Sequence, residues 1–508
     1  MQDVDLDSLP DDTDQLKQLI VTQATELRYL QEQLNLALYR RFGNRSEKNP
    51  AQHELFDEPE QLVEQESDPD QTDDAEAIEV SSHQRKPRGR KPLPEHLPRI
   101  EVIHDLDEAD KVCGMDGHVL HKIGEEVSEQ LEIIPAQFQV IRNIRIKYGC
   151  RACETGVKIA PLPAQLIPKS MATASLLSYV ATSKYADALP LYRQEQMFKR
   201  IGVDLSRATL AFWMIQVGKA LGPIIALLQD ALLQGGVIHM DETPVQVLKE
   251  PGRKAQSQSY MWVRAGGMAD HPIVLFDYDP SRGGQVPTRL LKGFKGHLMT
   301  DGYAGYRGVT RKDITGIGCW AHVRRKFKEA EKIQGKSKGS GKVQMALNEI
   351  QKLYAIEREI REKPLDETQQ IREARAGPIL DKMRDWLDKS LDQVPPKTTL
   401  GKALKYMHSE WPRLIRYVGN GRLPIDNNHC ENALRPFVVG RKNWLFSDSQ
   451  AGAQSSAAIY SLIETAKRTG HEPWRYLTHA LKELPTTEPD DLHMLLPYNI
   501  LPATLDDK

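Results

Sequence analysis

Three acidic residues, each in a distinctive local setting, constrain the fold of this 508-residue chain most strongly. Asp241 lies in VIHMDETPVQV and Asp301 in GHLMTDGYAGY, and each follows a short apolar run typical of a buried strand. Both carboxylates are therefore expected at or near strand ends. Glu431 differs, because Glu431, Leu434 and Val438 fall at helical spacing, so that a helix could carry this carboxylate back across the sheet.

Carboxylates that converge from separate elements are the oxygen ligands that Mg²⁺ and Mn²⁺ prefer. Two such ions, roughly 3.5–4 Å apart, can activate a water or a 3′-hydroxyl and stabilise the leaving oxygen of an in-line displacement. Taken singly, each acidic residue is explained as well by a turn or a helix cap. Together their settings favour a divalent-metal site in a protein that would cut or rejoin nucleic acid.

Seven stretches of the chain resemble the transposases of the insertion sequence 66 family of bacterial mobile elements. They are LALYRRFGNRSEK, IGEEVSEQLEIIPAQFQVIRNIRIKYGCRACE, KYADALPLYRQEQMF, VIHMDETPVQV, GCWAHVRRKF, PIDNNHCENALRPFVVGRKNWLFSDS and SLIETAKRTGHEPWRYL. The resemblance implies a ribonuclease-H-like domain with a catalytic Asp-Asp-Glu triad at Asp241, Asp301 and Glu431. Hydrolysis at a transposon end would release a 3′-hydroxyl, which would then attack target DNA.

Two other functions remain open at this point. A ribonuclease-H-like nuclease would cut without joining strands, and a non-catalytic DNA-binding protein would not need Asp241 at all. Under the transposase interpretation, the partners are double-stranded DNA, at the transposon ends and the target, and the family implies small accessory proteins of the same element.

The net charge of −2 hides a partition of charge along the chain. Residues 54–79 contain acidic side chains and no Lys or Arg, whereas residues 85–99 and 435–442 are basic. No apolar run approaches 18 residues and no signal-like amino terminus is present, so neither a membrane span nor secretion is expected. Five cysteines are too few for a disulfide framework, which favours the cytoplasm and association with the nucleoid. Cys319 and Cys430 lie alone and are explained by packing.

Residues 1–50 are expected to form a coiled-coil, leucine-zipper-like helix. Its seam alternates spacings of four and three and contains one polar residue; the members are Leu16, Ile20, Gln23, Leu27, Leu30, Leu34 and Ala37. The seam favours a homodimer or a higher oligomer. An amphipathic helix packed on its own chain is the alternative.

Residues 51–98 have the composition of a disordered acidic linker with one basic, AT-hook-like motif. In this motif Arg88, Gly89, Arg90 and Lys91 could approach DNA, because glycine allows close approach of the backbone and arginine fits a narrow minor groove. A basic linker that touches phosphates without preference is the alternative.

Residues 99–165 are expected to form a zinc-ribbon-like module, with QFQVIRNIRIKYG as a strand. The candidate Zn²⁺ ligands are Cys113, Asp116, His118, Cys150 and Cys153, with His121 as a further candidate. The family's first Cys-x-x-Cys pair is altered, because Asp116 stands where the second thiolate belongs. A degenerate ribbon that folds without metal is the alternative.

The remaining segments are expected to form a multidomain α/β protein whose catalytic core is a mixed sheet with flanking helices. Apolar spacing in residues 166–232 indicates helices, and a helical bundle is favoured over a helix-turn-helix because Leu210, Trp213 and Met214 resemble core residues. The expected divisions after this segment are core residues 233–326, a helical insertion at 327–422, core residues 423–470 and a C-terminal tail at 471–508.

Four cations are expected to contact DNA near the carboxylates. Arg324 and Arg325 follow His322 in GCWAHVRRKF, and Arg435 and Lys442 follow Glu431 on its helix. For the first pair a solvated helix face is the alternative, and for Arg435 an intrahelical pair with Glu431. A core position is expected for Trp444.

Overall fold

In a computed structural model of the chain, the residues described are 12–42, 138–149, 157–268, 270–309, 313–334 and 341–506. The chain divides into two units, one formed by Met1–Pro69 with Pro163–Lys508 and the other by Asp70–Leu162. In the second unit, β1 (Lys147–Gly149) and β2 (Val157–Ile159) pair antiparallel. The strand expected over residues 137–149 was therefore too long, since only its last three residues are in a strand.

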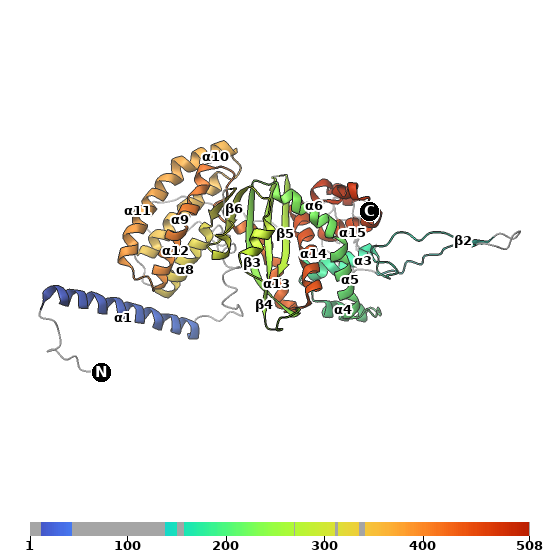
Figure 1. The fold of residues 1–508 in the computed structure, drawn as a ribbon, viewed down its shortest axis with the longest axis horizontal. Coiled ribbons are helices and arrows are strands. Elements are labelled where there is room, and N and C mark those ends of the chain that lie inside the picture. Colours follow the sequence, from blue (N-terminus) through green and yellow to red (C-terminus); the bar gives the residue numbers. More distant parts are fainter. Residues whose placement is uncertain are drawn as a thin grey trace, which may run out of the picture. The chain divides into compact units, whose positions relative to one another are not determined.

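A mixed sheet forms the centre of the first unit (Figure 1). Its strands lie in the order β5-β4-β3-β6-β7; their bounds in chain order are β3 Val237–Lys249, β4 Gln258–Met268, β5 His271–Asp279, β6 Gly296–Thr300 and β7 Ile314–Gly318. Strands β3, β6 and β7 run parallel, while β4 and β5 run antiparallel to their neighbours. The strands expected around SYMWVRAGG, PIVLFDYD and GIGCW are all present, with the short helix α7 (Gln285–Leu290) between β5 and β6.

The helix that carries the third acidic residue and the next long helix cover the sheet. Helix α13 (Asn428–Trp444) packs on β3 and β4, and α14 (Gln450–Arg468) packs on β5; between them β8 (Ser447–Ser449) pairs with the far end of β3. Strand β5 is an edge strand, whose backbone groups need partners outside the sheet. Side chains of α14 supply them, because Thr465 Oγ1 bonds both the N–H and the carbonyl of Val274, and Ser461 Oγ accepts the N–H of Phe276 at 2.8 Å.

Four helices precede the sheet and share its hydrophobic core: α3 (Ala174–Tyr185), α4 (Leu191–Arg200), α5 (Arg207–Ala220) and α6 (Gly222–Leu233). Leu210, Trp213 and Met214 are buried, as the bundle interpretation predicted, although Phe212 beside them is 51% exposed. Helices α5 and α6 pass a length-and-composition test for a membrane span only as a pair bent by 48°, and no single described helix passes it.

The expected helical insertion separates β7 from α13. Its helices are α8 (Trp320–Gln334), α9 (Lys342–Glu359), α10 (Leu365–Ile371), α11 (Gly377–Gln393) and α12 (Thr399–Leu414), and they enclose a second hydrophobic core (Figure 1). Helix α12 packs on both β7 and α8. The Trp320 indole N–H donates to the Leu414 carbonyl at 3.0 Å, so the insertion is fixed to the strand end from which it leaves.

The remaining helices lie at the two ends of the chain. Helix α1 (Thr13–Phe42) is as long as the zipper-like prediction requires, and its seam residues Leu27, Leu30 and Leu34 are exposed in the single chain. Helices α15 (Pro473–Glu483) and α16 (Ala503–Asp506) belong to the C-terminal segment.

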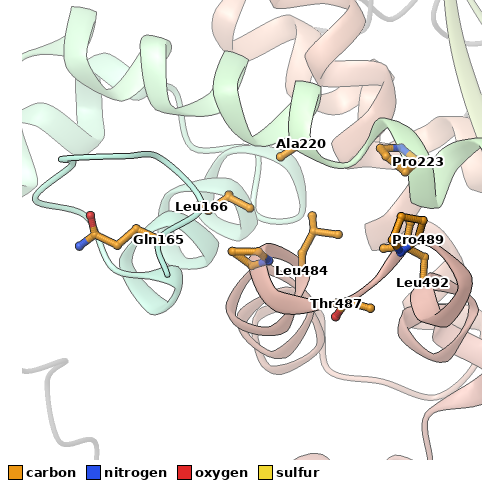
Figure 2. Close-up of a pocket in the computed structure, with 9 residues that line it drawn as sticks. Gln165, Leu166, Ala220, Pro223, Leu484, Thr487, Pro489 and Leu492 are labelled. Atoms are coloured by element: carbon orange, nitrogen blue, oxygen red, sulfur yellow. The ribbon is translucent and has the colours of Figure 1, made fainter. Parts of the chain in front are cut away.

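A groove of about 410 Å³ lies between the α5–α6 junction and the C-terminal segment (Figure 2). Its walls include Ala220 and Pro223 on one side and Leu484, Pro489 and Leu492 on the other. None of the residues that line it titrates, so this groove lacks the groups that phosphoryl transfer needs.

The contact between α5 and α14 predicts a size limit at Gly218. A Cβ at this position would lie 2.5 Å from the Ser455 backbone, so Gly218→Ala should lower the free energy of unfolding by about 1–3 kcal/mol. Gly222→Ala is the matched control, because nothing lies within 4 Å of a Cβ there. Urea unfolding followed by circular dichroism measures both, and equal midpoints would contradict the close packing.

Candidate active site

The parallel pairing of β3 with β6 places two aspartates at one level. Val237, Ile238 and His239 pair with His297, Leu298 and Met299 in turn. Asp241 and Asp301 each lie two residues beyond the last of these pairs. Because neighbouring strands are about 4.8 Å apart, this register brings the two residues side by side.

Each aspartate is held by a backbone N–H that follows it. Asp241 Oδ1 accepts from the Glu242 N–H at 2.8 Å, and Asp301 Oδ1 accepts from the Tyr303 N–H at 2.9 Å. Asp301 lies directly after β6, as expected, whereas Asp241 lies within a longer strand than expected, since β3 continues to Lys249. The pairing of β3 with β6 ends at His239, so Asp241 still lies beside the end of β6.

Buried Asn427 attaches the start of α13 to the strand that carries Asp241. Its side-chain N–H₂ donates to the Met240 carbonyl at 3.2 Å, and its side-chain oxygen lies 2.9 Å from His239 Nδ1. Glu431 lies in the first turn of α13 and is buried. The helix predicted for Glu431 is therefore confirmed, and it brings this carboxylate to β3.

The three carboxylates lie close enough to alter one another's ionisation. Burial raises the pKa of Asp241 well above its ordinary value, and the negative charges of Glu242, Glu431 and Asp301 raise it further. Burial also raises the pKa of Asp301 and of Glu431, although the Tyr303 N–H opposes the shift for Asp301 and Arg325 opposes it for Glu431.

These residues fit a hard divalent cation. Burial and the neighbouring carboxylates Glu242, Glu431 and Asp301 all raise the pKa of Asp241, so a bound cation would relieve this repulsion. Glu431 Oε1 is buried and has no hydrogen-bond partner among the described residues. Asp241, Asp301 and Glu431 would hold the ion, since oxygen ligands from separate elements suit Mg²⁺ or Mn²⁺.

A fourth carboxylate, Glu242, was not singled out from the sequence. One of its oxygens accepts from Arg282 Nε at 2.7 Å and the other accepts from the Tyr306 hydroxyl. Both oxygens are thus occupied by the protein, which distinguishes Glu242 from its neighbour Asp241. Only its place directly after Asp241 could have indicated a role near the site.

The helical insertion contacts the segments that carry Asp301 and Glu431. The Tyr406 hydroxyl, on α12, accepts from the Gly302 N–H at 3.1 Å, directly after Asp301. The Tyr354 hydroxyl, on α9, donates to Asp426 Oδ2 at 2.8 Å, and Asp426 Oδ1 accepts from the Asn428 N–H at the start of α13. The insertion therefore supports the site rather than merely interrupting the sheet.

The cations predicted on α8 do not form an open face. Arg324 is buried, with 8% of its surface exposed. Arg325 is half-buried and donates to Glu431 Oε2 at 3.1 Å, and the Lys326 ammonium lies 4.7 Å from the centre of the Tyr406 ring. The solvated-face alternative is therefore wrong for Arg324, Arg325 lies at the site through its pair with a carboxylate, and contact of either with DNA stays a prediction.

The cations predicted on α13 occupy different positions along the helix. Arg435 is half-buried one turn after Glu431, whereas Lys442 is exposed in the last turn. Trp444 packs against the hydrophobic core, as predicted, and Lys184 lies 5.0 Å from the centre of its ring.

Ten predicted site residues lie outside the described residues. They are the AT-hook-like Arg88, Gly89, Arg90 and Lys91 and the zinc candidates Cys113, Asp116, His118, His121, Cys150 and Cys153.

The geometry defines a mixed α/β protein with a buried carboxylate cluster where the parallel pairing of β3 and β6 ends. Residues 169–455 match the family described as "Transposase IS66 family". This match spans more than half of the chain, and the chain belongs to the insertion sequence 66 family of transposases.

Three further segments match elements of the same transposases. Residues 110–154 match a "zinc-finger binding domain of transposase IS66", and residues 461–498 match the "IS66 C-terminal element". Residues 29–102 match a segment described as "Transposase C of IS166 homeodomain". These matches support DNA as a partner, and the zinc-finger match suggests Zn²⁺ binding in the segment where it was expected.

Proteins of Sinorhizobium fredii are similar over most of their length. The uncharacterized protein y4jD is 32% identical over 512 residues, which cover 97% of each chain. The uncharacterized protein y4qI is 33% identical over 83% of this chain and 79% of its own.

Removing a buried charge from the site should stabilise the metal-free protein. Because the pKa of Asp241 is raised in the folded state, its ionised form costs stability above that pKa, and the cost disappears as pH falls toward the unfolded value near 3.8. Asp241→Asn should therefore raise the thermal midpoint in EDTA at pH 8, by the equivalent of at most about 1.4 kcal/mol for each unit of the pKa shift.

At about pH 4 the thermal midpoint of Asp241→Asn should be close to that of the parent. Mg²⁺ should raise the midpoint of the parent by more than it raises the midpoint of Asp241→Asn. Asp279→Asn is the matched control, because Asp279 also ends a strand of this sheet but pairs with Arg289. If the parent is as stable as Asp241→Asn at pH 8 in EDTA, ionisation of Asp241 carries no cost in the folded chain and the prediction is wrong.

The tyrosine of the insertion should affect metal affinity. Tyr406→Phe deprives the Gly302 N–H of its acceptor beside Asp301, and loss of such a supporting contact weakens metal binding about 10–100-fold. Titration calorimetry with Mn²⁺ measures the change. Tyr192→Phe, at an exposed position on α4, is the control and should bind as the parent does; equal affinities for all three proteins would remove Tyr406 from the site.

Proposed function

We propose that this chain is a transposase of the Asp-Asp-Glu type, which hydrolyses phosphodiesters at transposon ends and joins the released 3′-hydroxyl to target DNA. The observation that carries the proposal is the electrostatic convergence of Asp241, Asp301 and Glu431 in a chain of a transposase family. The mixed sheet with flanking helices supports a ribonuclease-H-like catalytic domain, divided by the insertion.

The cofactor proposed is a pair of Mg²⁺ or Mn²⁺ ions held by the three carboxylates. When bound, such ions activate the attacking oxygen and stabilise the leaving oxygen of an in-line displacement. The chain's own residues fix the geometry: backbone N–H groups orient the two aspartates, and Asn427 and Arg325 position Glu431. No Tyr or Ser nucleophile is required, because the incoming DNA supplies the hydroxyl.

Several DNA contacts are proposed around this centre. Exposed Lys442 lies at the far end of the helix that carries Glu431, where it can reach a backbone phosphate, and Arg435 lies nearer to the carboxylates. Arg325 can contact the strand being cut if it exchanges Glu431 for a phosphate. The AT-hook-like segment at 88–91 is proposed to add minor-groove contacts.

Assembly is proposed to involve the amino-terminal helix and the zinc module. The exposed Leu27, Leu30 and Leu34 of α1 would be buried in a homodimer or higher oligomer. Zn²⁺ is proposed to bind through the candidates at 113–153, within the zinc-finger match. Small accessory proteins of the same element are further proposed partners.

Cleavage and strand transfer on labelled transposon-end DNA, with Mg²⁺ or Mn²⁺, test the proposal. Asp241→Asn, Asp301→Asn and Glu431→Gln should each lower both activities by at least about 100-fold, since each removes a group that stabilises the transition state. DNA binding, measured by fluorescence anisotropy, should persist in all three variants.

Asp279→Asn should retain both activities. Cleavage without strand-transfer products would favour the nuclease alternative, and full activity in any of the three carboxylate variants would remove that residue from the triad. If the purified parent binds DNA but neither cleaves nor joins it, even with the element's accessory proteins added, the proposal is wrong.

A further inference from the structure

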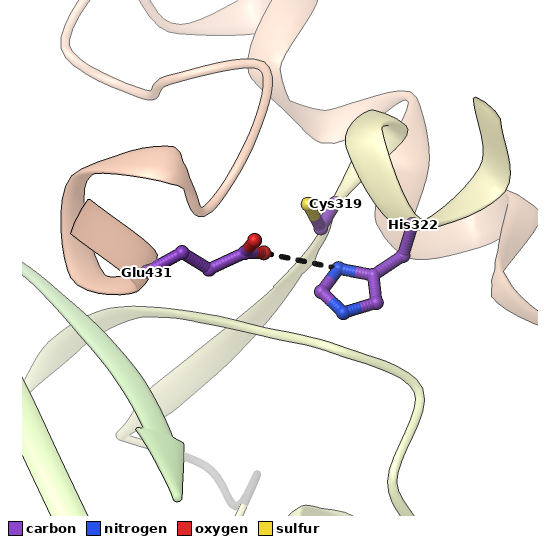
Figure 3. A group of neighbouring side chains, drawn as sticks. All are labelled: Cys319, His322 and Glu431. Carbon is purple, nitrogen blue, oxygen red and sulfur yellow. Dashed lines mark ion pairs between the residues drawn. The ribbon is translucent and has the colours of Figure 1, made fainter. Parts of the chain in front are cut away.

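A second group of side chains that can bind a metal ion shares Glu431 with the carboxylate cluster. Cys319 follows the last residue of β7, His322 lies in the first turn of α8, and Glu431 comes from α13 (Figure 3). The cysteine sulfur, a ring nitrogen and a carboxylate oxygen all lie within 4.8 Å of one another. The junction of β7 and α8 thus presents one sulfur and one nitrogen ligand, and α13, distant in sequence, presents one oxygen ligand to the same point.

Two polar atoms of this group are buried without a hydrogen-bond partner among the described residues. They are His322 Nδ1 and Glu431 Oε1, which lie 3.5 Å apart. This separation is longer than the 2.7–3.2 Å of an ordinary hydrogen bond. Buried polar atoms are nearly always satisfied, so a pair that faces each other in this way points to a missing ligand between them.

The sulfur of Cys319 is arranged as an acceptor. The backbone N–H of Asn427 donates to it at 3.2 Å, and the backbone N–H of His322 donates to it as well. Hydrogen bonds of this kind support the ligands of metal sites from behind. Buried Cys430 lacks this arrangement, since its thiol donates to the Val263 carbonyl at 3.6 Å instead.

The ligand types select the metal. Mg²⁺ takes oxygen ligands, whereas Zn²⁺ binds thiolate, imidazole and carboxylate together at about 2.0–2.3 Å. In a tetrahedral site with these bond lengths, ligand atoms lie roughly 3.3–3.8 Å apart, so the group observed needs only a small contraction. Three protein ligands would leave a fourth position for water or substrate oxygen.

We propose that Cys319, His322 and Glu431 form a binding site for Zn²⁺, which shares Glu431 with the proposed Mg²⁺ site. Binding transfers the thiol proton of Cys319 to solvent, because the thiolate is the ligand. The proposed catalytic function enters only through the shared carboxylate: occupation of this site limits the ways in which Glu431 can serve Mg²⁺. Zn²⁺ binding itself requires no cleavage activity.

The test uses Co²⁺ as a spectroscopic substitute for Zn²⁺, because a thiolate bound to Co²⁺ gives a charge-transfer absorption. The full-length chain is prepared with Cys113, Cys150 and Cys153 replaced by Ser, so that the zinc-finger segment contributes no thiolate. Titration of this protein should give the absorption with one Co²⁺ per chain, and Zn²⁺ should displace it.

Three further replacements in that protein decide the assignment. Cys319→Ser should abolish the absorption, and His322→Asn should weaken Zn²⁺ binding by more than about 100-fold, since loss of a supporting contact alone costs about 10–100-fold. Cys430→Ser, at an equally buried thiol, should leave both unchanged. Thermal unfolding in EDTA confirms that each variant is folded before it is compared.

No absorption in the starting protein, or an absorption that survives Cys319→Ser, would overturn the proposal. An equal loss in Cys430→Ser would also overturn it. Because these measurements contain no DNA, their failure leaves the triad untouched, and a failure of the cleavage assay leaves the Zn²⁺ site untouched.

Discussion

Several carboxylates are held together in the interior of this protein, and the rest of the site is built around the free energy that this costs. Burial disfavours the charged forms of Asp241, Asp301 and Glu431, and the charge of Asp301 adds repulsion at Asp241 and at Glu431. Such a cluster persists in the folded chain only if the surrounding contacts hold it. The parallel register of β3 and β6, the side chain of Asn427 and the backbone N–H groups after each aspartate provide that support.

The insertion and the edge of the sheet are part of the same support. Tyr406 and Tyr354 fix the two segments that carry Asp301 and Glu431, and Arg325 of the same insertion pairs with Glu431 directly. On the other side, α14 satisfies the edge strand β5 through Ser461 and Thr465. The sheet is therefore fastened on both sides of its central strand by residues distant in sequence.

Local pattern was sufficient to predict the strands around Asp241 and Asp301 and the helix that carries Glu431. Each depends on the spacing of apolar residues, which is a property of neighbouring positions. The contacts of Tyr406, Asn427 and Arg325 could not be predicted in this way, because their partners lie about 100 residues or more away. Arg324 shows the limit clearly: a run of cations predicts an exposed face, and only the packing of α8 shows that this side chain is buried.

The insertion also determines when the carboxylate cluster can first exist. Glu431 follows Asp301 by about 130 residues, and chains are synthesised at roughly 5–20 residues per second. For several seconds at least, a growing chain therefore presents both aspartates while their third partner is still unmade. A polypeptide interrupted in this interval would carry both aspartates and the amino-terminal segments proposed to contact DNA, while its carboxylate centre stays incomplete. If it binds transposon ends as proposed for the full chain, such a product would block those ends without cutting them.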